Sequence, residues 1–231
     1  MTTEHSTYDR SFDELRTGFT AAVSHELRTP LARILVLLES AELPGANVSS
    51  LIEQARDEVE NAGALIDEIL FLSELESGKE VVSLGHTTAL PILEDVATDL
   101  ADSAARAGVS LEVGGDASID LPLRPRMLRI LVKNLVENAI RYAGHGAAFS
   151  ITIRRAGTFA VLEASDDGSG VDPETLGRLF ERFYRGDAAR TTRGTGLGLS
   201  IVKHMVAAAG GEVEADGARG RGLRIRCTFP L

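Results

Sequence analysis

The sequence has a single cysteine, no long apolar run and no excess of basic residues. One cysteine, Cys227, excludes an internal disulfide and a metal site built from several cysteines, and it fits a reducing cytoplasmic setting. Apolar runs such as Ile34–Leu38 are far shorter than the ~20 residues that a membrane-spanning helix needs, so any membrane attachment is expected in segments outside this sequence. The net charge of −10 argues against a nucleic-acid partner, which would require a basic face.

Residues 10–77 carry apolar side chains at helical spacing and predict two long helices. The segment Leu43-Pro44-Gly45 breaks the pattern between them, so the helices are expected to form an antiparallel hairpin. The apolar positions of the first helix are Phe12, Leu15, Phe19, Val23, Leu27, Leu31, Ile34 and Leu38. In the second helix they form a heptad pattern of Val48, Ile52, Ala55, Val59, Ala62, Ile66 and Ile69.

A single hairpin would leave much of this apolar surface in water. Further leucines widen the stripe of the second helix, namely Leu51, Leu65, Leu70 and Leu72. Two hairpins can bury such a stripe by closing into a four-helix bundle, so the sequence predicts a homodimer. The alternative is that the stripe packs against the rest of the same chain.

From about residue 82 the pattern changes to alternating helices and strands. Helices are expected at about 88–106, 124–142 and 199–209, and strands at 110–113, 149–154, 159–165 and 223–229. A sheet with helices on one face is an α/β sandwich. The predicted fold class is therefore α+β, with a helical hairpin over residues 1–78 and a sandwich domain over residues 79–231.

The segment Ser24–Leu31 places a reactive side chain on the first helix. His25 lies two residues from both Val23 and Leu27, so its helical position is about 200° from those core positions and faces solvent. The neighbouring Glu26 can orient the imidazole ring or accept its proton. Pro30 removes a backbone donor inside the helix and is expected to bend it near Glu26, which offers a hinge beside the imidazole. The alternative is a solvated surface histidine.

Two glycine-rich segments of the second half can approach a ligand closely. Asp166-Asp167-Gly168-Ser169-Gly170 follows a predicted strand, and Asp166 can accept a hydrogen bond from an exocyclic amine. Gly194-Thr195-Gly196-Leu197-Gly198-Leu199 opens a helix whose free amides can cradle phosphates. This second segment is neither a Walker loop nor a dinucleotide fingerprint, since no Gly-Lys-Ser/Thr follows it and no convincing strand precedes it.

The helix predicted at 124–142 carries two asparagines on one face. Asn134 and Asn138 are four residues apart, and amide oxygens suit Mg²⁺, which prefers hard oxygen ligands together with water and substrate phosphate. Lys133 and Arg141 add positive charge for phosphates. Taken alone, such a helix face could equally be a solvated one. The segment Phe180–Arg185 adds aromatic side chains before an arginine-containing loop.

In their order along the chain, these segments resemble the H-box, N-box, first glycine box, F-box and second glycine box of sensor histidine kinases. That family's ATP-binding domain belongs to the gyrase, Hsp90, histidine-kinase and MutL superfamily. The resemblance implies that His25 accepts the terminal phosphoryl group of ATP and that Glu26 assists proton movement. It also implies that Thr29, on the same helical face as His25, helps to place water for removing phosphate from a response regulator.

The same resemblance implies roles in nucleotide binding. Asn138 would be the main Mg²⁺ ligand, with Asn134 and Glu137 nearby. Arg141 would reach phosphate, Tyr142 would flank the nucleotide, and Asp166 would read the adenine amino group. The pocket and its lid would be shaped by Gly168, Gly170, Arg193, Gly194, Thr195, Gly196, Leu197 and Gly198.

Three functions are consistent with parts of this pattern. The leading one is a kinase core that uses ATP and Mg²⁺ to phosphorylate His25 and then passes the phosphoryl group to the receiver domain of a response regulator. A phosphotransfer adaptor with a degenerate nucleotide domain is disfavoured by the intact glycine boxes and asparagines. An ATPase that drives a clamp is disfavoured because related ATPases carry a glutamate where this chain has Asn134, and an amide is a poor base.

Overall fold

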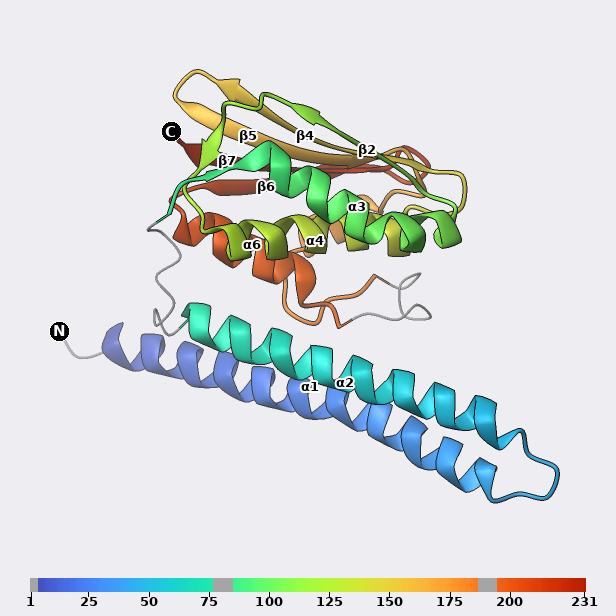
Figure 1. Cartoon of the computed structure of the whole chain (residues 1–231). Helices are drawn as coiled ribbons and strands as arrows, with labels where there is room; N and C mark the ends of the chain where they lie inside the picture. The colour runs from blue at the N-terminus through green and yellow to red at the C-terminus, as the bar shows by residue number, and fades with distance from the viewer. Residues whose placement is uncertain (1–3, 77–84, 187–194) are drawn as a thin grey trace. The chain divides into compact units, whose positions relative to one another are not determined.

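The computed structural model describes residues 4–76, 85–186 and 195–231, with side chains of the first helix described from Val23 onward. By its contacts the chain divides into two compact units, Met1–Phe71 and Leu72–Leu231. The predicted fold class, a helical hairpin followed by an α/β sandwich, is confirmed (Figure 1). The predicted domain boundary between residues 78 and 79 lies outside the described residues and stays a prediction.

The first unit consists of two long helices side by side (Figure 1). Helix α1 spans Glu4–Ala41 and helix α2 spans Val48–Glu76, so the connection falls at the predicted break. Asn47 caps the start of α2, where its Oδ1 accepts a hydrogen bond from the Ser50 amide at 3.2 Å. Arg33 Nη1 on α1 lies 3.4 Å from Oε1 of the buried Glu58 on α2. Because a buried carboxylate requires partners, this pair helps to fix the register of the two helices.

Only part of the predicted heptad pattern of α2 lies between the two helices. Ala55 is buried, whereas Val48, Ile52, Val59 and Ile66 are exposed. The positions of a heptad repeat form two adjacent stripes on a helix, and here the stripe that contains Val59 points away from the hairpin's own interior. The apolar surface of α2 therefore exceeds what α1 alone covers.

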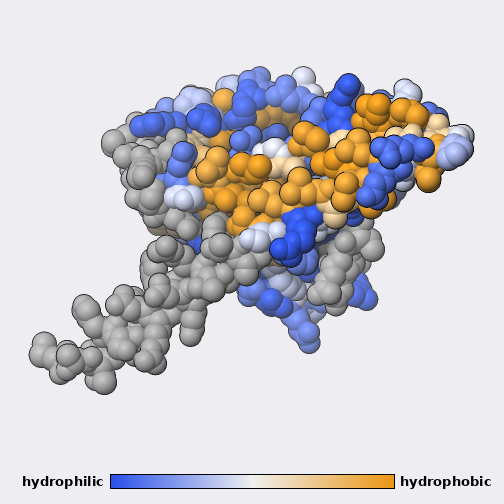
Figure 2. Space-filling model, turned by 90° about the horizontal axis from the view of Figure 1, so that it is seen from below, coloured by the Kyte–Doolittle hydropathy of each residue, from blue (hydrophilic) through white to orange (hydrophobic). Residues whose placement is uncertain are grey.

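Helix α1 carries a matching exposed band. Leu31, Leu35 and Leu38 repeat in steps of four and three residues, and each is at least half exposed. Figure 2 shows apolar side chains gathered in one continuous area of the molecular surface. An apolar area of this extent is typical of an interaction surface rather than of a face that stays in water.

The second unit is a five-stranded mixed sheet covered on one face by α3, α4 and α6 (Figure 1). The strand order is β2-β4-β5-β7-β6, with β2 parallel to β4 and every other neighbouring pair antiparallel. A separate two-stranded sheet pairs β1 with β3. The elements are β1 Thr87–Thr88, α3 Ala89–Ala107, β2 Ser110–Gly115, β3 Asp120–Leu121, α4 Pro125–Tyr142, β4 Ala148–Ala156, β5 Phe159–Asp166, α5 Pro173–Leu176, α6 Gly198–Ala208, β6 Glu212–Gly217 and β7 Leu223–Pro230.

The predicted helices and strands of this unit agree with the observed ones to within two residues at each end. Strand β6 and the short elements β1, β3 and α5 were not predicted from the sequence. Strand β6 alternates exposed acids with half-buried Val213 and Ala215, so its apolar period is weak. Residues 218–222 form the loop that joins the antiparallel pair β6 and β7.

Strand β7 shows how the sheet separates its two faces. Its inward side chains are buried, namely Leu223, Ile225, Cys227 and Phe229. On the opposite face, Arg226 Nη2 lies 3.0 Å from Glu163 Oε2 of β5, and Arg224 pairs with Asp216 of β6. The Cys227 thiol is completely buried in the core, and this burial raises its pKa to about 12.

Candidate functional site

His25 projects into solvent from α1. Its side chain is 76% exposed, which agrees with the predicted outward position. The Oε1 atom of Glu26 lies 3.7 Å from the Nδ1 atom of the ring. This separation is an ion-pair distance and is longer than a hydrogen bond, as is common for catalytic pairs before substrate binds. Because Glu26 faces Nδ1, the Nε2 atom is the ring nitrogen left available for attack on an electrophile.

The residues that follow His25 shape the same turn of helix. Thr29 Oγ1 donates a hydrogen bond to the carbonyl oxygen of His25 at 3.3 Å, and Thr29 itself is exposed. Pro30 lies inside α1, which continues through it as a single helix. Since proline has no amide hydrogen, the carbonyl of Glu26 lacks its usual helical partner. The bend expected at this place stays a prediction.

A pocket in the second unit is lined by α4 and by strands β4, β5 and β7. Its polar groups are Asn138 of α4 and Asp166 at the end of β5. Its apolar walls are formed by Leu135, Ala139, Phe149, Ala164, Leu223 and Ile225. The sheet register brings the walls together, because Phe149 pairs with Asp166 and Ala164 pairs with Ile225. The lining therefore combines apolar walls with one amide and one carboxylate, a composition typical of small-molecule sites.

Asp166 is held in place by the glycine segment that follows it. Its Oδ1 atom accepts a hydrogen bond from the Gly168 amide at 3.0 Å. Burial raises the pKa of Asp166 above its ordinary value of 3.8, although hydrogen bonds from the amides of Gly168 and Leu223 act in the opposite direction. Desolvation therefore outweighs these two hydrogen bonds.

The raised pKa of Asp166 predicts a pH dependence of adenosine binding. If the ionised carboxylate accepts a hydrogen bond from the adenine amine, adenosine affinity is complete near neutrality and falls as the pH is lowered toward the raised pKa. The loss should begin at a higher pH than an ordinary aspartate with a pKa of 3.8 would give. Titration of adenosine into the chain from pH 7 downward measures this, since adenosine has no phosphate to titrate. An affinity that stays constant until the ordinary aspartate range would contradict the role of Asp166.

The glycines of the first segment are required by close backbone contacts. A Cβ atom on Gly168 would overlap the carbonyl of Ala143, which accepts a hydrogen bond from the Ser169 amide at 2.8 Å. Gly170 has a positive φ of 64°, and a Cβ there would overlap the carbonyl of Ala218. The Gly222 amide donates to the Gly168 carbonyl at 3.0 Å. The β6–β7 loop thus supports the wall of the pocket, a role that the sequence analysis did not assign to it.

The second glycine segment joins the start of α6 to α4. Leu197 is completely buried, and its amide donates to Thr195 Oγ1 at 3.2 Å. A Cβ on Gly198 would lie 2.5 Å from Oδ1 of Asn134, whose Nδ2 atom donates to the Ile130 carbonyl at 2.9 Å. Asn134 therefore packs against the first residue of α6.

Gly196 joins the second glycine segment to the aromatic segment Phe180–Arg185. It has a φ of 72°, and its carbonyl accepts a hydrogen bond from the Phe183 amide at 3.0 Å. Phe183 also has a positive φ, of 58°, which is uncommon for a residue with a side chain. The predicted site residues Arg193 and Gly194 lie outside the described residues.

Arg141 and Tyr142 lie at the C-terminal end of α4. Tyr142 is half-buried, and Arg141 is partly exposed with its Nη2 atom 3.0 Å from Glu137 Oε2. Asn138 is half-buried, and its amide makes no hydrogen bond within the part of the chain that the structure describes. The structure thus brings Asn138 and Asp166 into one pocket and places Asn134, Arg141 and Tyr142 on the helix that borders it.

The apolar walls of the pocket were missed by the sequence analysis as site residues. The available signal for these walls was the inward alternation of Leu223 and Ile225 on β7. Alternation predicts which face of a strand belongs to the core, but it does not predict which part of that face lines a pocket. The pairing of Glu137 with Arg141 was also not foreseen, although their spacing of four residues permits it.

The exposed imidazole–carboxylate pair on a helical hairpin and the amide, aspartate and glycine pocket of the sandwich define a phosphotransfer core with a nucleotide site. Two family models match the corresponding parts of the chain. Residues 15–78 match the His Kinase A (phospho-acceptor) domain, and residues 124–231 match the histidine kinase-, DNA gyrase B- and HSP90-like ATPase.

Relatives and solved structures agree with these matches. The sensor-like histidine kinase SenX3 of Mycobacterium tuberculosis (strain ATCC 25618 / H37Rv) is 34% identical over 241 residues, which cover 98% of this chain and 56% of SenX3. The sensor protein QseC of Escherichia coli (strain K12) is 34% identical over 216 residues, which cover 91% of this chain and 47% of QseC. The structure of histidine kinase ThkA in complex with response regulator protein TrrA has the same fold, with a TM-score of 0.74 at 20% identity over 99% of this chain and 67% of that chain.

The chain belongs to the sensor histidine kinases of two-component signal transduction, of which it carries the catalytic core. The resemblance found in the sequence is thereby confirmed, and ATP is the nucleotide that this family's ATPase domain uses. The chain spans about half the length of the curated relatives that it matches. Within the described residues, none of the helices combines the length and the apolar character needed to cross a membrane.

Proposed function

We propose that this chain binds ATP in the pocket between Asn138 and Asp166, phosphorylates itself on His25, and passes the phosphoryl group to an aspartate of a response regulator. The observation that carries the proposal is the exposed His25 with Glu26 at its Nδ1 atom, on a chain that also holds a small pocket lined by Asn138 and Asp166. A cytoplasmic location suits this reaction, because ATP and response regulators are found there.

In the proposed reaction, the Nε2 lone pair of neutral His25 attacks the γ-phosphorus of ATP. The N–P bond forms while the bond from the γ-phosphorus to the bridging oxygen breaks, and ADP leaves with that electron pair. Glu26 stabilises the positive charge that grows on the ring and takes the Nδ1 proton. The product is a phosphoramidate, and its labile bond allows the phosphoryl group to pass to an aspartate carboxylate as an acyl phosphate.

The pocket residues fit a Mg²⁺-bound nucleotide. The Asn138 amide lies at the rim of the pocket with no hydrogen bond inside the described part of the chain, and a carboxamide oxygen is a suitable Mg²⁺ ligand. Bound Mg²⁺ would neutralise phosphate charge in the transfer. Asp166 would accept the adenine amino hydrogen bond, Arg141 would contact phosphate, and Tyr142 would flank the nucleotide.

Two residues bear on hydrolysis. Asn134 packs against Gly198 at the position where related ATPases carry a glutamate base, so this chain offers no carboxylate there to activate water. Transfer to His25 is therefore favoured over release of free phosphate. Thr29, one helical turn from His25, would place the water that removes phosphate from the regulator in the reverse activity.

The exposed apolar bands of α1 and α2 support a homodimer in which two hairpins form a four-helix bundle.

Leu35→Glu is then expected to weaken dimerisation by at least ~100-fold, because it would bury an unpaired carboxylate in the interface. The matched control is Val36→Glu. Val36 is as exposed as Leu35, 58% against 57%, but it points about 100° away from Leu35 on the helix. Light scattering after gel filtration should show monomers for Leu35→Glu only. A dimeric Leu35→Glu variant would place the interface elsewhere.

Incubation of the wild-type chain with γ-³²P-labelled ATP and Mg²⁺ tests the proposed activity against its alternatives. A histidine kinase retains label on the protein, and that label is lost in acid and stable in base. Release of free phosphate without labelled protein would identify an ATPase instead. A chain that binds no nucleotide but accepts phosphate from a phosphorylated partner would be an adaptor.

A further inference from the structure

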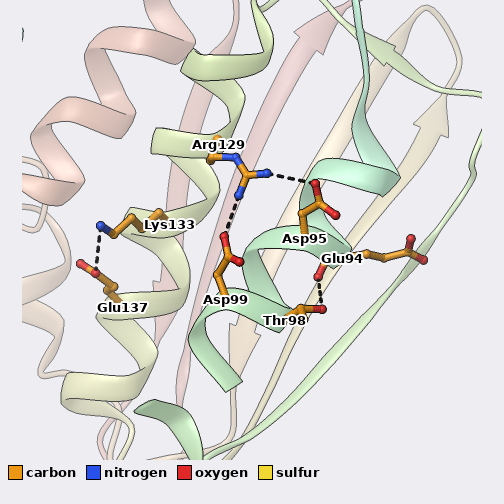
Figure 3. Close-up of polar contacts among 7 residues, drawn as sticks. All are labelled: Glu94, Asp95, Thr98, Asp99, Arg129, Lys133 and Glu137. Atoms are coloured by element: carbon orange, nitrogen blue, oxygen red, sulfur yellow. Dashed lines mark hydrogen bonds and ion pairs between the residues drawn. The ribbon is translucent and has the colours of Figure 1, made fainter. Parts of the chain in front are cut away.

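A row of ion pairs runs along α4 beside the face that borders the pocket. Lys133, Glu137 and Arg141 follow one another at intervals of one turn. Glu137 Oε2 lies 3.0 Å from Arg141 Nη2, and Glu137 Oε1 lies 3.7 Å from Lys133 Nζ. Arg129, one turn before Lys133, reaches Asp95 and Asp99 of α3, and Figure 3 shows its side chain extending away from those of Lys133 and Glu137. The three side chains of the row pair with one another, whereas Arg129 joins α4 to α3.

Helical geometry places one end of this row, Arg141, next to Asn138, which lines the pocket. Arg141 follows Asn138 by three residues, so the two positions are about 60° apart around α4. Asn138 lines the pocket together with Asp166. Glu137 precedes Asn138 by one residue, so the two positions are about 100° apart around α4. A single carboxylate, 26% exposed, thus holds Arg141 at this border of the site and also pairs with Lys133 one turn earlier on α4.

We propose that Glu137 competes with the phosphate groups of the nucleotide for Arg141 and Lys133, and so sets how strongly the site prefers phosphorylated nucleotides over adenosine. The proposal rests on the proposed function in taking ATP as the ligand. Partly exposed ion pairs between side chains are individually weak, and phosphate is a strong acceptor for the Arg guanidinium, so exchange of partners is favourable. A carboxylate that stays near the phosphates also repels them.

Glu137→Gln tests this directly, since the amide keeps the size of the side chain and removes its charge. Calorimetric titrations of the whole chain with ATP and ADP, in EDTA to exclude the metal, should give dissociation constants roughly threefold to tenfold lower than for the wild type. The dissociation constant for adenosine should not change, because adenosine has no phosphate. The difference should shrink in about 0.5 M NaCl, where exposed charges are screened.

Glu94→Gln is the matched control, because Glu94 is an exposed carboxylate on α3 that lies away from the row (Figure 3). It removes the same charge from the same unit, and it should leave ATP affinity unchanged. In a background of Arg141→Ala and Lys133→Ala, Glu137→Gln should lose its effect, since the partners for which it competes are absent.

Several results would overturn the proposal. They are an unchanged or raised dissociation constant for ATP and ADP in Glu137→Gln, an equal change for adenosine, or an equal change in Glu94→Gln. Weaker ATP binding that occurs only with Mg²⁺ present would also overturn it, because Glu137 would then assist the metal. A wild-type chain that binds adenosine, ADP and ATP with no preference would remove this proposal alone, whereas one that binds none of them would contradict the proposed function as well.

Discussion

Replacement of His25 by glutamine is expected to abolish acid-labile labelling of the chain by γ-³²P-labelled ATP. The glutamine amide has no nucleophilic lone pair comparable to that of the imidazole Nε2 atom, so no N–P bond can form. His25 is 76% exposed, and glutamine is of similar size and favourable in helices, so the hairpin should fold as before. Label should fall to background, while the dissociation constant for ADP should stay that of the wild type.

The matched control for this variant is His86→Gln. His86 is also exposed, but it precedes β1 in the other unit and has no place in the proposed transfer. It should retain full labelling. Label that persists in His25→Gln with the same acid lability would assign the phosphoacceptor to another histidine and would overturn the proposed role of His25.

Replacement of Asp166 by asparagine is expected to weaken ATP and adenosine binding by about 10- to 100-fold, since loss of a charged hydrogen-bond acceptor in a half-buried site costs about 1–3 kcal/mol. Asparagine keeps the shape of the side chain and the bond to the Gly168 amide. However, its amide NH2 group is a donor at the position where the adenine amino group needs an acceptor. Labelling of His25 should fall in parallel at low ATP concentration.

Two comparisons sharpen the test of Asp166. Asp167→Asn removes the same charge one residue away, and its Oδ1 can still accept the Ala148 amide, which lies at 2.7 Å. It should bind ATP normally. The wild type should also prefer ATP to GTP, because guanine presents a carbonyl in place of the amine, and Asp166→Asn should lose most of that preference. Equal losses in both variants would show a general charge effect instead of adenine recognition.

Local patterns in the sequence predict most of the fold. The steps of three and four residues and the Leu43-Pro44-Gly45 break define the hairpin, and the inward alternation of β7 defines one sheet face. Strand β6 was not predicted, because its register is set by hydrogen bonding to β7 and its own side chains are mostly acidic or small. Periodicity also could not assign Val59 and Ile66 to an exposed stripe, since adjacent stripes of a heptad pattern have the same spacing.

The candidate site was predictable where chemistry depends on residue type and spacing. His25 with Glu26, and Asn138 and Asp166, were selected in this way; Glu26 lies beside His25, and Asn138 and Asp166 line one pocket. The sequence alone could not show that Asn134 packs against Gly198, or that Glu137 holds Arg141. Those contacts depend on how α6 meets α4 and on side-chain conformations that no local motif encodes.

The most direct test of the central claim is to locate the phosphoryl group after reaction with ATP. Mass spectrometry of peptides prepared at neutral to basic pH preserves a phosphoramidate. The proposed function predicts a single phosphoryl group on the peptide that contains His25, present in the wild type and strongly reduced in Asp166→Asn at limiting ATP. A phosphoryl group on another residue, or release of free phosphate with His25 unmodified, would contradict the account.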